Sequence, residues 1–188
     1  MAFNRRHNEP NTGEITVQAR AGIRLVGQRL IEQVRDVLGV DFKEFIEAQW
    51  MFIMATSDDE ARMDCSYRGG MPGFVRVVDS KTLLFPDYNG NGSFMSLGNL
   101  TVNPHIGMLF IDFEKQRRLR VNGHAEIVED PAFVSQFPGA DRVVKVTVDQ
   151  AFPNCSRYIH KMVRVAEVPD DLGPLHLPES NRTGANQK

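Results

Sequence analysis

This sequence has few cysteines and nearly equal numbers of acidic and basic residues. Its 188 residues include two cysteines, Cys65 and Cys155, too few for a disulfide framework or a structural zinc site. The formal net charge of −2 lacks the basic excess typical of nucleic-acid-binding proteins. There is no run of about 18 apolar residues, and the start, MAFNRRHNEPNTGE, lacks the apolar region of a secretion signal. We therefore expect a protein of the reducing cytoplasm that binds neither nucleic acid nor membranes.

Several catalytic and ligand-binding motifs are also missing. The sequence contains no GxGxxG, Walker or GxSxG motif, which argues against Rossmann, P-loop and hydrolase proteins. The histidines at positions 7, 105, 124, 160 and 176 show no paired metal-ligand spacing, so we predict no metal site. No spacing supplies Cys155 with a base and an orienting residue, which favours a buried, inert thiol over a nucleophile.

The length suits one domain with an appendage at each end. Residues 1–13 are polar and are predicted to be a mobile arm, and residues 14–168 are predicted to form the domain. Residues 169–188 contain prolines and the run SNRTGANQK, a composition typical of a disordered tail.

Two helices are predicted before the first strand. Apolar residues recur at helical spacing from Ile23 to Val37, which predicts a helix over 22–38 that ends near Gly39. A second, short helix is predicted to start at Asp41, with the Asp41 side chain as its cap and Glu44 reaching back. One face of this helix is apolar and carries Phe42, Phe45 and Ile46.

The rest of the chain is dominated by short strands. Apolar runs and period-two alternation predict strands over 50–56, 63–68, 74–78, 82–85, 106–113, 118–127 and 144–149. One helix, over 94–100, is inserted among them, and 130–141 is predicted to be a loop or a short helix. Six or seven such strands close most easily into a small antiparallel barrel, because closure removes exposed sheet edges.

A glycine-rich turn before the inserted helix is the first candidate binding site. The segment NGNG at 89–92 tolerates positive φ and can turn several N–H groups toward one point. Ser93 is the predicted cap of the helix, which Asn103-Pro104 must end. A helix start beside free amides binds anions, phosphate above all, although an ordinary surface turn remains the alternative.

Two further polar segments are candidates. Arg68 ends a strand beside Gly69-Gly70, where its guanidinium would reach two phosphate oxygens; the alternative is a surface ion pair. Antiparallel pairing would bring Arg68 and the Asn-Gly turn to one rim of the barrel. In the segment NCSRYIH, Asn154 and Ser156 suit the edge of a heterocycle and Arg157 suits a charged group; the alternative is a helix start capped by Asn154. The basic residues Lys115, Arg117, Arg118 and Arg120 are typical of a solvated hairpin.

Four blocks taken together carry a family resemblance. They are FIMATSDDEARMDCSYRGGMPGFVRV, TLLFPDYNGNGSFMSLGNLTVNPHIGMLFIDF, RLRVNGHAEIVED and FPNCSRYIH. In this order they resemble the pyridoxamine 5′-phosphate oxidase-like proteins of the FMN-binding split-barrel fold, over about residues 45–162. The resemblance implies a mainly β split barrel, a homodimer with FMN sites at the subunit interface, and a small-molecule substrate.

The resemblance also implies which residues contact FMN. A strand arginine and the turn and helix after the next strand hold the phosphate in the family, and these positions here are Ser66, Tyr67, Arg68, Gly69, Pro86, Asp87, Asn91, Ser96, Leu97 and Asn99. A strand residue near the flavin ring aligns at Arg118 or Arg120. The late segment that contacts flavin from the partner chain corresponds to Asn154, Cys155, Ser156 and Arg157.

Two departures from the family bear on the activity. The usual Arg-Lys pair at the start of the inserted helix is Met95-Ser96, so phosphate charge must be met elsewhere or by backbone amides. Authentic oxidases end in a strand with Trp and Arg that binds the substrate phosphate, whereas the single tryptophan here is Trp50. We therefore expect an FMN-dependent oxidoreductase that does not oxidise pyridoxamine phosphate, and no catalytic residue can be named. The alternatives are a deazaflavin-dependent reductase, a non-catalytic flavin- or haem-binding carrier or sensor, and an interaction module without cofactor.

Overall fold

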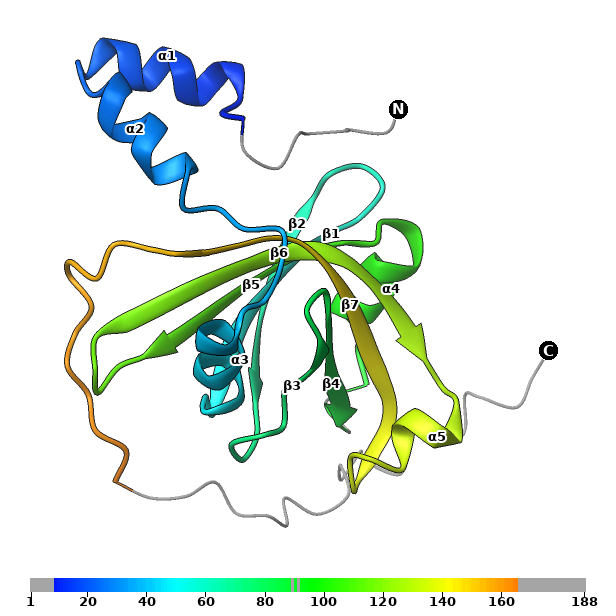
Figure 1. Ribbon diagram of the computed structural model, residues 1–188. Coiled ribbons are helices and arrows are strands. Elements are labelled where there is room, and N and C mark those ends of the chain that lie inside the picture. Colours follow the sequence, from blue (N-terminus) through cyan, green and yellow to red (C-terminus); the bar gives the residue numbers. More distant parts are fainter. Residues whose placement is uncertain (1–8, 89, 91, 166–188) are drawn as a thin grey trace.

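The computed structural model describes residues 9–88, 90 and 92–165, and its centre is one curled antiparallel sheet (Figure 1). The strand order is β2-β1-β5-β6-β7-β4-β3. The strands are β1 Met51–Ser57, β2 Met63–Gly69, β3 Arg76–Asp79, β4 Thr82–Tyr88, β5 His105–Asp112, β6 Arg117–Val128 and β7 Ala140–Pro153. The helices are α1 Thr12–Arg20, α2 Arg24–Ile31, α3 Val40–Glu47, α4 Met95–Val102 and α5 Pro131–Val134. The predicted mainly β split barrel is confirmed.

Alternate residues are buried along β1, β5 and β6, as predicted, whereas β4 buries five consecutive residues. Along β6, Leu119, Val121, Gly123 and Ala125 are buried, whereas Arg120, His124 and Glu126 between them are exposed. The interior holds an aromatic cluster around Phe52, whose ring centroid lies 5.1 Å from that of Phe85 and 5.2 Å from that of Phe110. Such buried aromatic contacts fix the curvature of the sheet by filling its interior.

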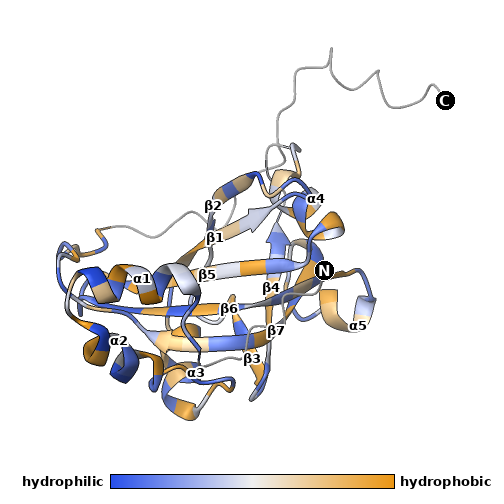
Figure 2. Cartoon of the chain, turned by 90° about the horizontal axis from the view of Figure 1, so that it is seen from above, coloured by the Kyte–Doolittle hydropathy of each residue, from blue (hydrophilic) through white to orange (hydrophobic). Residues whose placement is uncertain are grey.

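The helix prediction over 22–38 is wrong in extent. In this range the structure has one short helix, α2, which ends at Ile31, and a separate helix, α1, precedes the range. Residues beyond it leave the helical path because the backbone of Arg35 pairs with Ala151 of β7, through N–H···O distances of 2.9 and 2.7 Å. Part of the predicted arm is also helical, since α1 begins at Thr12, and residues 1–8 lie outside the described part of the chain. Figure 1 shows α1 and α2 projecting away from the sheet, and Figure 2 shows hydrophobic and hydrophilic residues intermixed along them.

The short helix predicted from Asp41 is present as α3, but its predicted cap is wrong. The N-cap is Gly39, and no side chain caps the helix. Phe42 and Ile46 are buried, and Phe45 packs against the core. The helix packs against β3, where the side chain of Lys43 donates to the carbonyl oxygen of Val77 at 2.9 Å. It therefore completes the core, as its apolar face predicted.

The inserted helix α4 packs against β1, β2 and β6. Its N-cap is Phe94, which adopts a left-handed conformation with φ 49°, so the predicted Ser93 cap is wrong. Its other end lies at Asn103, as predicted, and the Asn103 side chain donates to Ser57 Oγ at 2.8 Å. Asn99 donates to Thr56 Oγ1 at 3.1 Å, which fixes the middle of the helix over β1.

The predicted loop or short helix over 130–141 contains α5, capped by Asp130. Its residues Phe133 and Val134 pack with Leu84, Phe137 and Val143 in a second, smaller apolar cluster. None of the helices in the described ranges is both long and apolar enough to cross a lipid bilayer.

Candidate cofactor site

Arg68 and Asp87 form an ion pair across the open side of the sheet. Arg68 Nη1 lies 3.1 Å from Asp87 Oδ1, and the two side chains are 20% and 6% exposed. Alternation along β2 and β4 places both side chains on the inner face, with Phe52 and Phe85. Arg68 therefore forms an ion pair, as the alternative interpretation predicted. The Asp87 carboxylate is buried, however, so this pair does not lie on the surface.

Arg142 of β7 completes this cluster. It lies opposite Asp87 in the register of β4 and β7, and its Nη1 is 3.1 Å from Asp87 Oδ2. The hydrogen bond to Asp87 raises the pKa of the Arg142 guanidinium. Arg142 Nε also lies 3.5 Å from Oε1 of the more exposed Glu129, so the cluster holds two guanidinium groups and two carboxylates, of which only Asp87 is buried. Sequence patterns did not identify Arg142, because only the strand register places it beside Asp87.

The start of α4 adjoins the same cluster. The Arg142 guanidinium carbon lies 5.1 Å from the ring centroid of Phe94, the N-cap of α4. The first N–H groups of any helix lack partners within the helix, so they can donate to an anion. The Ser96 hydroxyl, by contrast, donates to Asp64 Oδ2 at 3.0 Å. Backbone amides and arginines, rather than Ser96, are thus the groups with capacity for phosphate.

A second polar cluster lies on the outer face of the sheet. Arg118 precedes the inward-facing Leu119, and the backbone N–H of Asn154 donates to the Arg118 carbonyl oxygen at 3.2 Å. The chain after β7 passes along the β5–β6 hairpin (Figure 1), held by a 2.7 Å hydrogen bond from Gln116 Nε2 to the Ile159 carbonyl oxygen. Asn154 starts no helix, so the helix-start alternative for this segment is wrong.

Three buried side-chain atoms lack a hydrogen-bond partner in the described part of the chain. They are Arg68 Nε, Arg118 Nε and Asn154 Oδ1. Buried polar groups are normally hydrogen-bonded, so an orphan group calls for an explanation such as an absent ligand or water. All three belong to residues singled out from the sequence.

The predicted residues are divided between the two faces of the sheet. Arg68, Asp87 and their neighbours lie on the inner face, whereas Tyr67, Arg118 and Arg120 lie on the outer face. The inner set also includes Ser66 on β2, the buried Ser96 and Leu97, and Asn99. Arg120 stacks on Phe152 at 5.5 Å from its ring centroid. Within one chain, the predicted cofactor-binding residues therefore form two separate groups, one on each face of the sheet.

The other predicted residues occupy varied positions. Gly69 ends β2, and Pro86 is buried in β4. The late residues Cys155, Ser156 and Arg157 are exposed, so the prediction of a buried thiol at Cys155 is wrong. Arg157 donates its backbone N–H to Cys155 Sγ at 3.4 Å. Asn91 lies outside the described residues, so its role stays a prediction.

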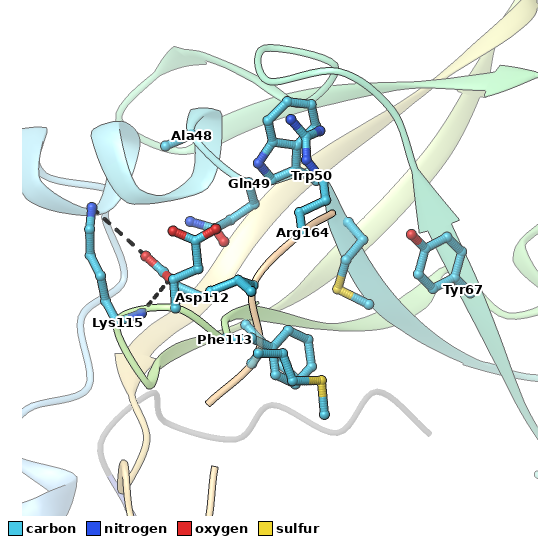
Figure 3. A pocket seen from close by; sticks show the side chains of 13 residues that line it. Ala48, Gln49, Trp50, Tyr67, Asp112, Phe113, Lys115 and Arg164 are labelled. Atoms are coloured by element: carbon cyan, nitrogen blue, oxygen red, sulfur yellow. Dashed lines mark hydrogen bonds and ion pairs between the residues drawn. The ribbon is translucent and has the colours of Figure 1, made fainter. Parts of the chain in front are cut away.

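A pocket opens on the outer face at the ends of β1 and β5. Its volume is about 360 Å³, within the range for small-ligand sites. Figure 3 shows Trp50, Tyr67 and Phe113 around it, with the Arg164 side chain over the Trp50 ring. Lys115 and Asp112 lie at its edge. Tyr67 is the one predicted cofactor residue in this lining, so the pocket adjoins the outer cluster and not the Arg68–Asp87 pair.

A match to a known protein family covers most of the described chain. The family model described as pyridoxamine 5′-phosphate oxidase matches residues 40–163, from α3 to the pocket lining. No curated protein matches the sequence.

Two solved structures illustrate the fold similarity. A HupZ protein of Group A Streptococcus is 22% identical, with 61% of this chain and 92% of that chain covered and a TM-score of 0.50. A putative pyridoxamine 5′-phosphate oxidase of Lactobacillus delbrueckii is 16% identical, with 63% and 95% covered and a TM-score of 0.50. At these sequence identities the similarity shows a shared fold and not a shared function.

Proposed function

Because the chain belongs to the pyridoxamine 5′-phosphate oxidase family, we propose that it binds FMN and acts as an oxidoreductase on a small molecule. The observation that carries this proposal is the location of the three orphan atoms, Arg68 Nε, Arg118 Nε and Asn154 Oδ1, on three residues expected to contact the cofactor. FMN, when bound, can reversibly accept electrons or hydride at its ring system.

The inner cluster suits the phosphate end of such a ligand. Asp87 holds the guanidinium groups of Arg68 and Arg142 in place, side by side on the inner face. Arg68 Nε is a buried donor with no partner among the described residues, and a charge-assisted hydrogen bond to a phosphate oxygen would satisfy it. The first amides of α4 would add neutral donors. Arg142 places a guanidinium group beside the start of α4, where the sequence has Met95-Ser96 in place of the family's Arg-Lys pair.

The outer cluster suits the edge of a heterocycle. Arg118 Nε is a donor and Asn154 Oδ1 an acceptor, and the two residues are joined through the backbone. A ring edge that carries a carbonyl beside an N–H group would satisfy both. Since the two clusters lie on opposite faces of the sheet within one chain, we propose a homodimer in which the outer cluster of one subunit completes the inner site of its partner.

The substrate of the proposed enzyme is a small molecule other than pyridoxamine phosphate. The single tryptophan, Trp50, lies in the pocket lining beside Arg164 and not on a C-terminal strand. The chain's own residues would orient the ring and exclude water. No described group of three or more His, Cys, Asp or Glu side chains could hold a metal ion, and we assign no catalytic residue.

The absorption spectrum of the purified protein tests the cofactor. We expect a yellow protein that absorbs near about 450 nm and is bleached by a reduced nicotinamide, and mass spectrometry of the released ligand should give FMN. If the released ligand is a deazaflavin or haem, that molecule and not FMN is the cofactor. FMN without bleaching or turnover would support the carrier instead of the oxidoreductase.

Substitution of Arg68 tests the site. Arg68→Ala should lower FMN affinity by roughly 1.5–3 kcal/mol, about 10- to 100-fold, because a hydrogen bond to a charged group is lost. Arg62→Ala is the matched control, since Arg62 pairs with Asp58 and Glu60 at the β1–β2 turn. Unchanged FMN affinity in a folded Arg68→Ala protein would show that Arg68 does not bind phosphate. Sedimentation of the loaded protein should give a dimer, and a flavin-loaded monomer would overturn the shared site.

A further inference from the structure

His105 and His124 form a cross-strand pair at the end of the sheet near α4. They lie directly opposite each other in the register of β5 and β6. Their ring centroids are 4.6 Å apart, with an interplanar angle of 52°. Both residues are exposed, and both belong to the outward-facing set of their strands. The pair is distinct from both clusters of the proposed flavin site.

The hydrogen bonds of Asn103 fix the tautomer of His105. Asn103 Nδ2 donates to Ser57 Oγ at 2.8 Å and faces the Asp58 carbonyl oxygen at 3.4 Å, so Asn103 Oδ1 points toward His105. This oxygen accepts from the His105 backbone N–H at 3.2 Å and lies 2.8 Å from His105 Nδ1. An amide oxygen can only accept, so His105 donates from Nδ1, and in the neutral imidazole the lone pair is then on Nε2.

Asp149 acts in the same way on His124. Its Oδ2 lies 2.6 Å from His124 Nδ1, which makes Nδ1 the donor to the carboxylate. A β-bulge supports this contact, because Asn122 pairs with Gln150 and Gly123 with Val148, so Asp149 is the extra residue on β7. Bulges commonly re-aim a side chain in this manner. In the neutral imidazole, His124 Nε2 therefore also keeps its lone pair.

We propose that His105 and His124 form a binding site for a divalent transition-metal ion of the Zn²⁺ class, with Nε2 of each ring as a ligand. Metal-ligating histidines typically donate the other ring N–H to a carboxylate or carbonyl oxygen, which is the arrangement present on both rings. Among the described residues, neither Nε2 atom has a hydrogen-bond or ion-pair partner.

The spacing of the rings agrees with this role. With metal–nitrogen bonds of about 2.0–2.1 Å, two imidazoles that bind one ion at roughly 90–110° have ring centroids about 4.5–5.5 Å apart. The observed separation is 4.6 Å. The protein supplies two ligands, so water or a small anion fills the remaining positions. The two histidines are 19 positions apart in the sequence (124 minus 105), which is why linear spacing predicted no metal site.

Titration of the untagged, chelator-treated protein with ZnCl₂ tests the proposal. Isothermal titration calorimetry should show one Zn²⁺ site per chain, at least tenfold weaker in either His105→Ala or His124→Ala and absent in the double variant. His160→Ala, which removes an exposed histidine elsewhere, should bind as tightly as the original protein. Asp149→Ala should weaken binding about 10- to 100-fold while both ligands remain.

A second measurement does not depend on substitutions. Co²⁺ added to the unaltered protein should broaden the imidazole NMR signals of His105 and His124 before those of His160. Equal Zn²⁺ affinity in the double variant, or equal broadening of all three histidines, would mean that metal binds to the surface without a specific site and would overturn the proposal.

Discussion

The Arg68 guanidinium lies 3.1 Å from the Asp87 carboxylate, although four strands separate β2 from β4 in the sheet. This contact is possible because the sheet curls until its two ends meet. It places a positive group at the junction, held by a buried acid. The cluster therefore links the closure of the barrel to the proposed phosphate site.

Asp87→Ala should destabilise the protein by about 3–5 kcal/mol, because it removes the buried carboxylate shared by Arg68 and Arg142 and leaves Arg142 with only the exposed Glu129. Urea unfolding followed by circular dichroism measures this loss. Glu126→Ala breaks the exposed pair with Lys145 and should cost no more than about 1 kcal/mol. Equal losses of unfolding free energy in the two variants would contradict the conclusion that Asp87 stabilises the protein more than an exposed ion pair does.

Phe52→Ala should cost about 3–5 kcal/mol, because Phe52 is fully buried and contacts the rings of Phe74, Phe85 and Phe110. Chemical denaturation gives the difference in the free energy of unfolding. Met63→Ala, on the exposed part of β2, should stay within about 0.5 kcal/mol. A small effect at Phe52 would mean that the interior collapses to fill the space.

Gly123→Ala should destabilise the sheet by about 1–3 kcal/mol, because a Cβ at this position would overlap the carbonyl oxygen of Thr147. Thermal unfolding compares this variant with Gly98→Ala in α4, where the space around the added methyl is open. The helical substitution should be neutral or stabilising by about 0.5–1 kcal/mol. Tolerance of alanine at 123 would show that the bulge beside Asp149 does not need glycine.

Asp58→Asn should flatten the acid side of the stability–pH curve. Hydrogen bonds from the backbone and the side chain of Arg62 lower the pKa of Asp58 below its ordinary value of 3.8. A lowered pKa in the folded state means that this contribution is complete above about pH 3.8 and is lost as the pH falls through the folded value. Unfolding measured from pH 6 to pH 3 should show the difference. Asp59→Asn, in the same turn, changes the charge equally, and an identical curve for the two variants would contradict the prediction.

Period-two alternation made the strands predictable. A strand such as β6 buries every second residue, so its burial pattern is present in the sequence itself. The N-terminal helices were harder to place, since the pairing of Arg35 with Ala151 overrides helical spacing in the chain after Ile31. The caps at Asp41 and Ser93 failed for a related reason, because packing of the whole helix sets where it begins.

The candidate site was predictable where it depends on residue type and not where it depends on register. Arg68 and Asn154 carry orphan atoms and were identified as polar residues at strand ends. Arg142 was missed, because its role follows from lying opposite Asp87 in β7. The pairing of His105 with His124 arises from register in the same way. Contacts between strands distant in sequence need the three-dimensional arrangement.

The sheet begins at β2 and ends at β3, and in the described chain these two strands exchange no backbone ladder with each other. Side-chain contacts such as that of Arg68 with Asp87 close the cylinder there, so it can widen at this slit without the loss of any strand pairing. Opening of the barrel at this slit therefore costs the buried Arg68–Asp87 contact but no backbone ladder, so the seam of the barrel is held by the same side chains that are proposed to bind phosphate.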